Sequence, residues 1–185
     1  MVKPRSFRRH LFRRFSRDRS GATAVELALL SFPFFFMLMM IVETAMIFWT
    51  RQVLQEALGQ ASRTILTGES RTLYPGPPAA QATAFRAAIC ARMRMSSDCT
   101  TRLIVDVQPQ STFTGAPGSM VSGGAIDETQ YAMRPVQPSE IVIIRAAYKA
   151  PVFVAGYFGS LSRLTTGENV LESVLAFRAE PFPTS

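Results

Sequence analysis

The side chains that most often carry enzyme chemistry are scarce in this sequence. Its 185 residues include one histidine, His10, and two cysteines, Cys90 and Cys99. The chain after His10 therefore cannot build a Ser-His-Asp triad or a histidine-ligated zinc site, and two thiols are too few for a four-thiolate metal site. We expect a protein without a catalytic site, a bound metal or a cofactor.

Carboxylates remain as candidates for acid–base catalysis. An enzyme would have to use Asp106, Asp127 or Glu128, and no larger acidic cluster surrounds them in the sequence. We therefore expect a protein that acts by binding, and keep a membrane-anchored periplasmic enzyme as an alternative.

The positive charge of the chain is concentrated at its N-terminus. The formal net charge is +7, and residues 1–21 contain eight basic side chains and one acidic side chain, Asp18. The remaining residues are formally neutral, whereas a nucleic-acid-binding face would need a surplus of basic residues there. We expect no nucleic-acid partner. A basic tail that binds nucleic acid is the alternative, which the apolar run directly after it disfavours.

That apolar run, residues 22–49, predicts a transmembrane helix. Between Leu27 and Val42 only Ser31 is polar, and Pro33 is tolerated in membrane helices. About 20 apolar residues span a bilayer core. A buried core helix this apolar would need a larger domain around it. A cleaved signal peptide would have a shorter apolar run that ends in a small-residue cleavage site.

The charges on either side of the span predict its orientation. Eight basic residues precede it, and only Arg51 and Arg63 fall within twenty residues after Thr50. The positive-inside rule then places the N-terminus in the cytoplasm. We expect a single-pass protein of the inner membrane with a periplasmic C-terminal domain.

Glu43 is an intramembrane polar residue. Its position near the outer end of the apolar run reduces the free-energy cost of inserting its charge into the membrane.

The boundary between leader and span carries a motif. Gly21 is followed five positions later by Glu26 and then by the apolar run, which resembles a type IV prepilin processing site. Residues 13–66 resemble the N-terminal region of TadE-like proteins, the pseudopilin-like components of tight-adherence (Flp) pilus systems. The resemblance rests on the G-A-T-A-V-E run at 21–26, on Glu43, and on the R-Q-x-L-Q-x-A run at 51–57.

The resemblance implies that a prepilin peptidase cuts after Gly21 and leaves Ala22 as the new N-terminus. The freed α-amine then needs a counter-charge at the membrane, which Glu26 of a neighbouring subunit can supply. The alternative is that Gly21 only begins the helix and that Glu26 is an interfacial residue.

The resemblance also implies a function and partners. The function is that of a minor pseudopilin or pilus-assembly component, which packs against other subunits, in the membrane or in the pilus. The partners are the lipid bilayer, other pilus or pseudopilin subunits, the prepilin peptidase and the inner-membrane assembly platform. An unprocessed single-pass scaffold protein is the alternative.

The helix is expected to continue beyond the bilayer to residue 67. An apolar stripe along it predicts a stalk that packs on other subunits, a helix that packs on its own domain, or both. Gly68 is the expected C-cap. The stripe consists of Val53, Leu54, Ala57, Leu58, Ala61, Ile65 and Leu66.

A second helix is predicted at 79–95, and the cysteines frame its end. In an unbroken helix the Cα atoms of Cys90 and Cys99 would lie about 13.5 Å apart, too far for a disulfide. The Ser96-Ser97-Asp98 run offers a break. Paired cysteines are more common than free thiols outside the cytoplasm, so we expect a disulfide. A redox-active pair is disfavoured, because the spacing is not C-x-x-C.

The rest of the chain predicts an α+β domain over residues 79–185. Runs rich in β-branched or aromatic residues predict a small antiparallel sheet of about four strands, packed on one or two helices. Residues 111–138 are rich in Gly, Ser and Pro and predict a flexible loop. The predicted strands are Leu103–Val107, Ile141–Tyr148, Val152–Tyr157 and Val170–Phe177.

Overall fold

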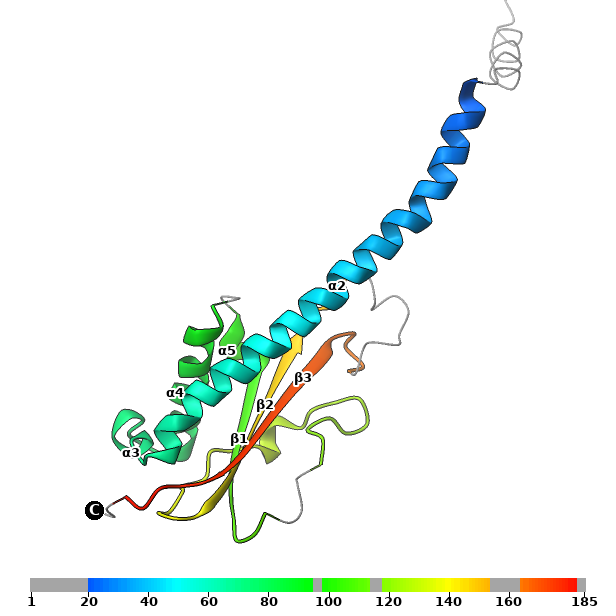
Figure 1. The fold of residues 1–185 in the computed structure, drawn as a ribbon. Coiled ribbons are helices and arrows are strands. Elements are labelled where there is room, and N and C mark those ends of the chain that lie inside the picture. The colour runs from blue at the N-terminus through cyan, green and yellow to red at the C-terminus, as the bar shows by residue number, and fades with distance from the viewer. Residues whose placement is uncertain (1–19, 95–97, 114–117, 154–163, 183–185) are drawn as a thin grey trace, which may run out of the picture. The chain divides into compact units, whose positions relative to one another are not determined.

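The computed structural model describes residues 20–94, 98–113, 118–153 and 164–182. The chain divides into two units, residues 1–42 and 43–185. In chain order the elements are α2 (Ser20–Leu66), α3 (Ser70–Leu73), α4 (Pro78–Met93), α5 (Cys99–Arg102), β1 (Leu103–Gln110), the short 3-10 helix η1 (Glu128–Gln130), β2 (Ile141–Ala150) and β3 (Asn169–Arg178) (Figure 1). The prediction of an α+β fold with a long N-terminal helix is confirmed.

The described part of the first unit is the apolar beginning of α2. The helix continues through Pro33 without a break. Among the described residues, α2 is the one helix long and apolar enough to cross a membrane, by length and composition, and its most apolar window has no buried residue.

The second unit is built on a three-stranded antiparallel sheet in the order β1-β2-β3. Asp106 of β1 lies opposite Arg145 of β2, and Val142 of β2 lies opposite Phe177 of β3. Side chains alternate between the two faces of a strand, so the register gives each face its own set of residues.

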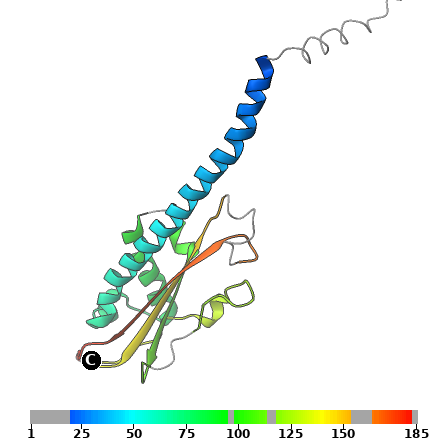
Figure 2. The same ribbon diagram turned by 45° about the vertical axis from the view of Figure 1, so that its right-hand side comes forward.

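One face of this sheet packs on the second half of α2 and on α4 (Figures 1 and 2). Leu54, Leu58 and Ile65 of α2 are at most 1% exposed, and Phe85 of α4 is fully buried. These side chains form one cluster with Val105, Ile144, Leu171 and other inward-facing residues of the strands. The apolar stripe of α2 therefore lies in the core of its own domain.

The opposite face of the sheet is covered by irregular chain. Ile104 and Ala147 form a smaller buried cluster with Met120 and Leu164, which lie outside the strands. Residues 118–138 therefore supply side chains to the core, although their only regular element is η1.

The segment after β3 lies against the end of α2. The amide of Glu180 donates to the carbonyl of Leu66 at 2.9 Å, and Phe182 lies beneath the Arg71 guanidinium at 5.0 Å. Gly68, just after the helix, has a φ of +78°, and a β-carbon built there would lie 2.5 Å from the Phe182 ring. Glycine is required both by the left-handed backbone and by the close approach of the ring.

The predicted fourth strand is described only in part, and the predicted end of the second helix needs correction. The described part of the chain contains three strands, where about four were expected. Val152 and Phe153 lie outside the strands, and the rest of the predicted strand, 154–157, lies outside the described residues. The second helix ends at Met93, two residues early, because Arg94 adopts the left-handed conformation with a φ of 50°.

We expect Gly68→Ala to lower the free energy of unfolding by about 2–5 kcal/mol. The left-handed backbone costs a residue with a β-carbon about 1–2 kcal/mol, and overpacking adds about 1–3 kcal/mol. Gly123→Ala is the matched control, since Gly123 also has a positive φ but no atom within 4 Å of the added carbon. Chemical unfolding in detergent measures both, and equal losses would show that Phe182 imposes no constraint.

Candidate functional site

The residues of the predicted processing site lie at the beginning of α2. Gly21, Ala22 and Glu26 are all exposed, and a side chain added at Gly21 would meet no atom within 4 Å. Ala22 and Glu26 are four residues apart, so they lie one turn apart on the same side of the helix. The described residues therefore leave the space at Gly21 open.

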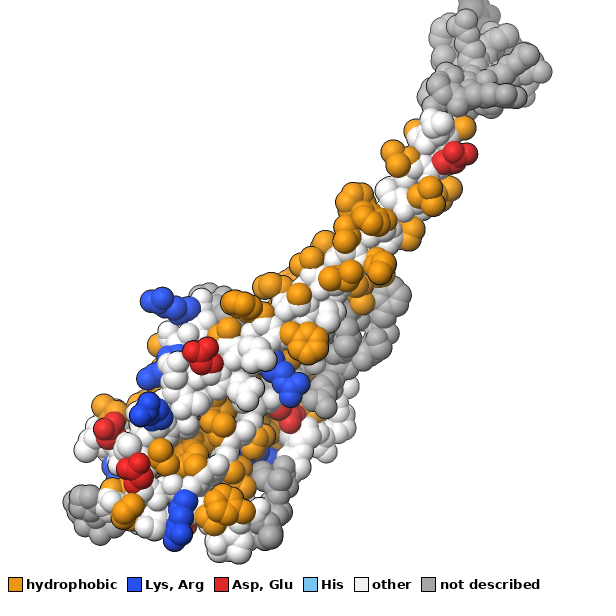
Figure 3. Space-filling model, in the orientation of Figure 1, with side chains coloured by type: hydrophobic (Ala, Val, Ile, Leu, Met, Phe, Trp, Pro, Cys, Tyr) orange, Lys and Arg blue, Asp and Glu red, His pale blue; other side chains and the backbone are white. Residues whose placement is uncertain are grey.

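Apolar side chains surround the Glu26 carboxylate on all sides of the helix. Figure 3 shows apolar side chains on the visible face of the first part of α2. A helix that is apolar all round is stable only when lipid or other helices cover it. The exposed large side chains of residues 22–42 are Val25, Leu27, Leu29, Leu30, Phe32, Phe34, Phe35, Met37, Leu38, Met39, Ile41 and Val42.

Glu43 lies in the second unit, apart from Glu26. It is half-buried, and its Oε1 accepts a hydrogen bond from the backbone amide of Phe153, three residues after the end of β2. The carboxylate therefore links α2 to the segment that follows β2. The sequence indicated that Glu43 was unusual, but it gave no sign of this partner 110 residues away.

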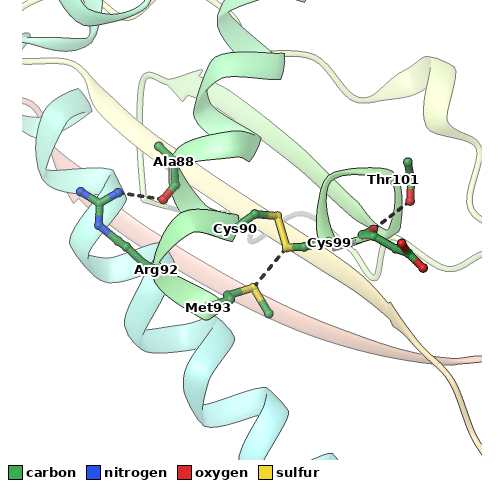
Figure 4. Close-up of a disulfide and its surroundings, with 7 residues drawn as sticks. Ala88, Cys90, Arg92, Met93, Cys99 and Thr101 are labelled. Carbon is green, nitrogen blue, oxygen red and sulfur yellow. Dashed lines mark hydrogen bonds between the residues drawn. A yellow bond between two sulfur atoms is a disulfide. The ribbon is translucent and has the colours of Figure 1, made fainter. Parts of the chain in front are cut away.

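The two cysteines meet between α4 and α5 (Figure 4). Cys90 and Cys99 form a disulfide with a Cα–Cα distance of 5.7 Å, as the break between the helices allows. The Met93 sulfur lies 3.9 Å from the Cys99 Sγ, and both residues are buried. The bond therefore fixes the end of α4 to the segment that leads into β1.

We expect every molecule to contain the Cys90–Cys99 disulfide. The chain that is denatured without a reducing agent should therefore take up no iodoacetamide. The reduced chain should take up two equivalents, measured by mass spectrometry. The double variant Cys90→Ser/Cys99→Ser should lose roughly 2.5–3 kcal/mol of unfolding free energy, as expected for a loop of about ten residues. Alkylation of the unreduced chain would contradict the pairing.

Asp106, the first of the candidate catalytic carboxylates, is fully buried in an ion pair. Its Oδ2 accepts from Arg145 Nε at 3.0 Å and from the same guanidinium's Nη2, and its Oδ1 accepts from the Ala132 amide. Arg145 also donates to the Gly118 carbonyl and lies 5.3 Å from the Tyr131 ring. These bonds fix residues from the irregular segment onto the sheet, which is a structural role.

Asp127 and Glu128 also have local partners. Hydrogen bonds from the Thr129 hydroxyl, then from the Gln130 side chain and the Thr129 amide, hold the pKa of Asp127 below its usual value. A carboxyl with a lowered pKa is ionised at neutral pH and is a poor proton donor there. Glu128 pairs with Lys149. The three candidate carboxylates therefore have separate partners, and the described residues contain no group of three or more potential metal ligands.

A small open cavity of about 390 Å³ lies between α2 and the edge strand β3. It is lined by Arg51 and Gln55 from the helix and by residues 170–174 from the strand. Neither histidine nor cysteine lines it, and its one carboxylate, Glu172, accepts a hydrogen bond from Ser119.

We expect Asp106→Ala to cost about 3–5 kcal/mol of unfolding free energy, because it leaves the Arg145 charge buried without its partner. Glu128→Ala is the matched control, because it removes a carboxylate whose ion pair with Lys149 is partly exposed. It should lower the free energy of unfolding by less than about 1 kcal/mol. Thermal unfolding of the two variants measures the difference. Similar losses would contradict the structural role of Asp106.

A comparison with known families bears on the helix that carries Gly21 and Glu26. Residues 21–63 match the model of the TadE-like protein family. The chain carries a TadE-like domain. This TadE-like domain begins at Gly21 and ends three residues before the end of α2, so it contains the apolar run and most of the buried stripe and leaves the sheet outside. No curated protein and no solved structure shows a significant match to the chain.

Proposed function

We propose that this protein is a minor pseudopilin or pilus-assembly component of a tight-adherence pilus system. It is anchored in the inner membrane by the first half of α2, with the N-terminal leader in the cytoplasm and the sheet domain in the periplasm. It acts by packing against other subunits and the assembly platform, and not by catalysis.

One observation supports this proposal most strongly. Gly21 and Glu26 lie at the start of an exposed apolar helix, within a TadE-like domain. A prepilin peptidase needs a segment that it can reach, and the surface around Gly21 is open. Cleavage after Gly21 creates a charged amine at Ala22 where the chain enters the membrane. A carboxylate from a neighbouring subunit can then neutralise that amine, because paired charges cost less in lipid than isolated ones.

The packing of α2 limits where subunits can meet. The stripe from Leu54 to Ile65 is buried in its own domain, so it is not available as a separate stalk surface. The exposed large apolar side chains of α2 all lie before residue 50, in and just beyond the proposed span. We therefore assign subunit packing to this first half of the helix.

The N-terminus of the protein from cells that contain the pilus system tests the processing step. We expect intact-mass spectrometry to find a chain that begins at Ala22, since cleavage removes residues 1–21. Gly21→Leu should retain Met1, because a bulky side chain at the cut site blocks the peptidase. An unmodified protein that retains Met1 would support the unprocessed scaffold and contradict the pseudopilin.

The role of Glu26 is tested by removing its charge. We expect Glu26→Ala and Glu26→Gln to enter the membrane normally and to lower the number of pili per cell by at least about tenfold, since loss of one partner of a buried charge pair costs about 3–5 kcal/mol. Glu56→Ala, an exposed carboxylate later in the same helix, is the control and should leave piliation unchanged. Normal piliation of the Glu26 variants would contradict the pairing role.

A further inference from the structure

Among the described residues of the second unit, few large apolar side chains remain exposed, and most of them are close to Glu43 in the sequence or bonded to it through the backbone. Met46, Phe48 and Trp49 of α2 are 55%, 63% and 65% exposed and come within six residues of it. Phe153, at 74%, is the most exposed large apolar side chain among the described residues of this unit, and its backbone bonds to Glu43. These four residues, the apolar collar, come from two segments that are distant in the sequence.

The hydrogen bond to Glu43 fixes the position of Phe153 relative to the helix. The backbone amide of Phe153 donates to the carboxylate, so the bond does not depend on the phenylalanine side chain. The ring is therefore left exposed in a stretch where Pro151 and Val152 also carry no charge.

Helix length places this collar near the surface of the bilayer. Residues 22–42 form 21 helical residues, about 31 Å at 1.5 Å per residue, which matches a hydrocarbon core of about 30 Å. Glu43 then comes at the outer boundary of the core, and Trp49 follows about 9 Å further along the helix, near the outer edge of the headgroup region. This step rests on the membrane span proposed above.

We propose that Phe153 inserts into the headgroup region of the outer leaflet, so that the sheet domain binds the lipid surface at a second point beside the helix. Phenylalanine, like tryptophan and leucine, is found on the apolar faces of helices that bury at the boundary between headgroups and acyl chains. The Glu43 carboxylate and the Phe153 amide satisfy each other where water is less available. The partner is lipid, because the hydrogen bond holds Phe153 beside Glu43, which follows the last residue of the proposed span and so lies at the outer boundary of the hydrocarbon core.

Depth-dependent fluorescence quenching tests this, because Trp49 is the only tryptophan in the chain. In a Trp49→Phe background, Phe153→Trp introduces one reporter at the collar. Phe32→Trp reports on the middle of the span, where the phenylalanine is 75% exposed. Phe113→Trp is the matched control: Phe113 is 61% exposed but follows β1 at the end of the sheet opposite to Phe153.

The full-length variants are reconstituted as purified proteins into phosphatidylcholine–phosphatidylglycerol vesicles that carry a quencher either near the headgroup or near the bilayer centre. We expect the reporter at 153 to lose at least half of its emission to the headgroup quencher and little to the central one. The reporter at 32 should show the reverse, and the reporter at 113 should be quenched by neither.

Quenching of the reporter at 32 by the central quencher shows that the membrane span is present. Given that quenching, two results at position 153 would overturn the inference. The first is a reporter at 153 that behaves like the one at 113. The second is a reporter at 153 with blue-shifted emission but no quenching, which would show a protein contact in place of lipid. An unquenched reporter at 32 would contradict the membrane span itself, and with it this inference.

Discussion

The structure depends on the burial of one apolar stripe of α2 beneath the sheet. Leu54, Leu58 and Ile65 have almost no exposed surface, and they join α4 and all three strands in a single core. The same helix begins with a segment that is apolar on every side and has no buried residue in its most apolar window. One continuous helix therefore combines two patterns: large apolar side chains are exposed along it as far as Trp49, and a single buried apolar stripe begins at Leu54.

Other contacts hold the second half of α2 in its place. The tail after β3 bonds to the last turn of the helix, and Phe182 occupies the space that Gly68 leaves open. Glu43 bonds to the segment after β2. The Asp106–Arg145 pair and the disulfide stabilise the far face of the sheet and the α4–α5 junction. In the proposed function this domain is carried by an anchor whose exposed surface is left to lipid and to other subunits.

Much of this fold could be predicted from the sequence, because its strongest signals are local. The apolar run, the stripe of α2 and the β-branched runs of the three strands define elements by periodicity, and the break after Met93 allowed the two cysteines to meet. The long-range partners could not be predicted: nothing in the sequence joins Glu43 to Phe153 or Gly68 to Phe182. Asp106 and Arg145 are single charges inside apolar strands, which could have indicated a buried ion pair. That the two residues lie opposite each other became known only from the pairing of β1 with β2. The candidate site at Gly21 and Glu26 was visible because both residues lie within one short segment.

Hydrogen–deuterium exchange of the full-length protein in lipid nanodiscs tests most directly whether the first half of α2 lies in lipid while its second half lies in the domain core. The account predicts that amides of residues 54–65 exchange as slowly as those of β2, since both lie in one cooperative core. It also predicts that residues 25–42 are protected in nanodiscs and remain protected when the core is unfolded by denaturant. Fast exchange of residues 54–65 beside a protected β2 would show a helix that is not part of the domain core, and would contradict the account.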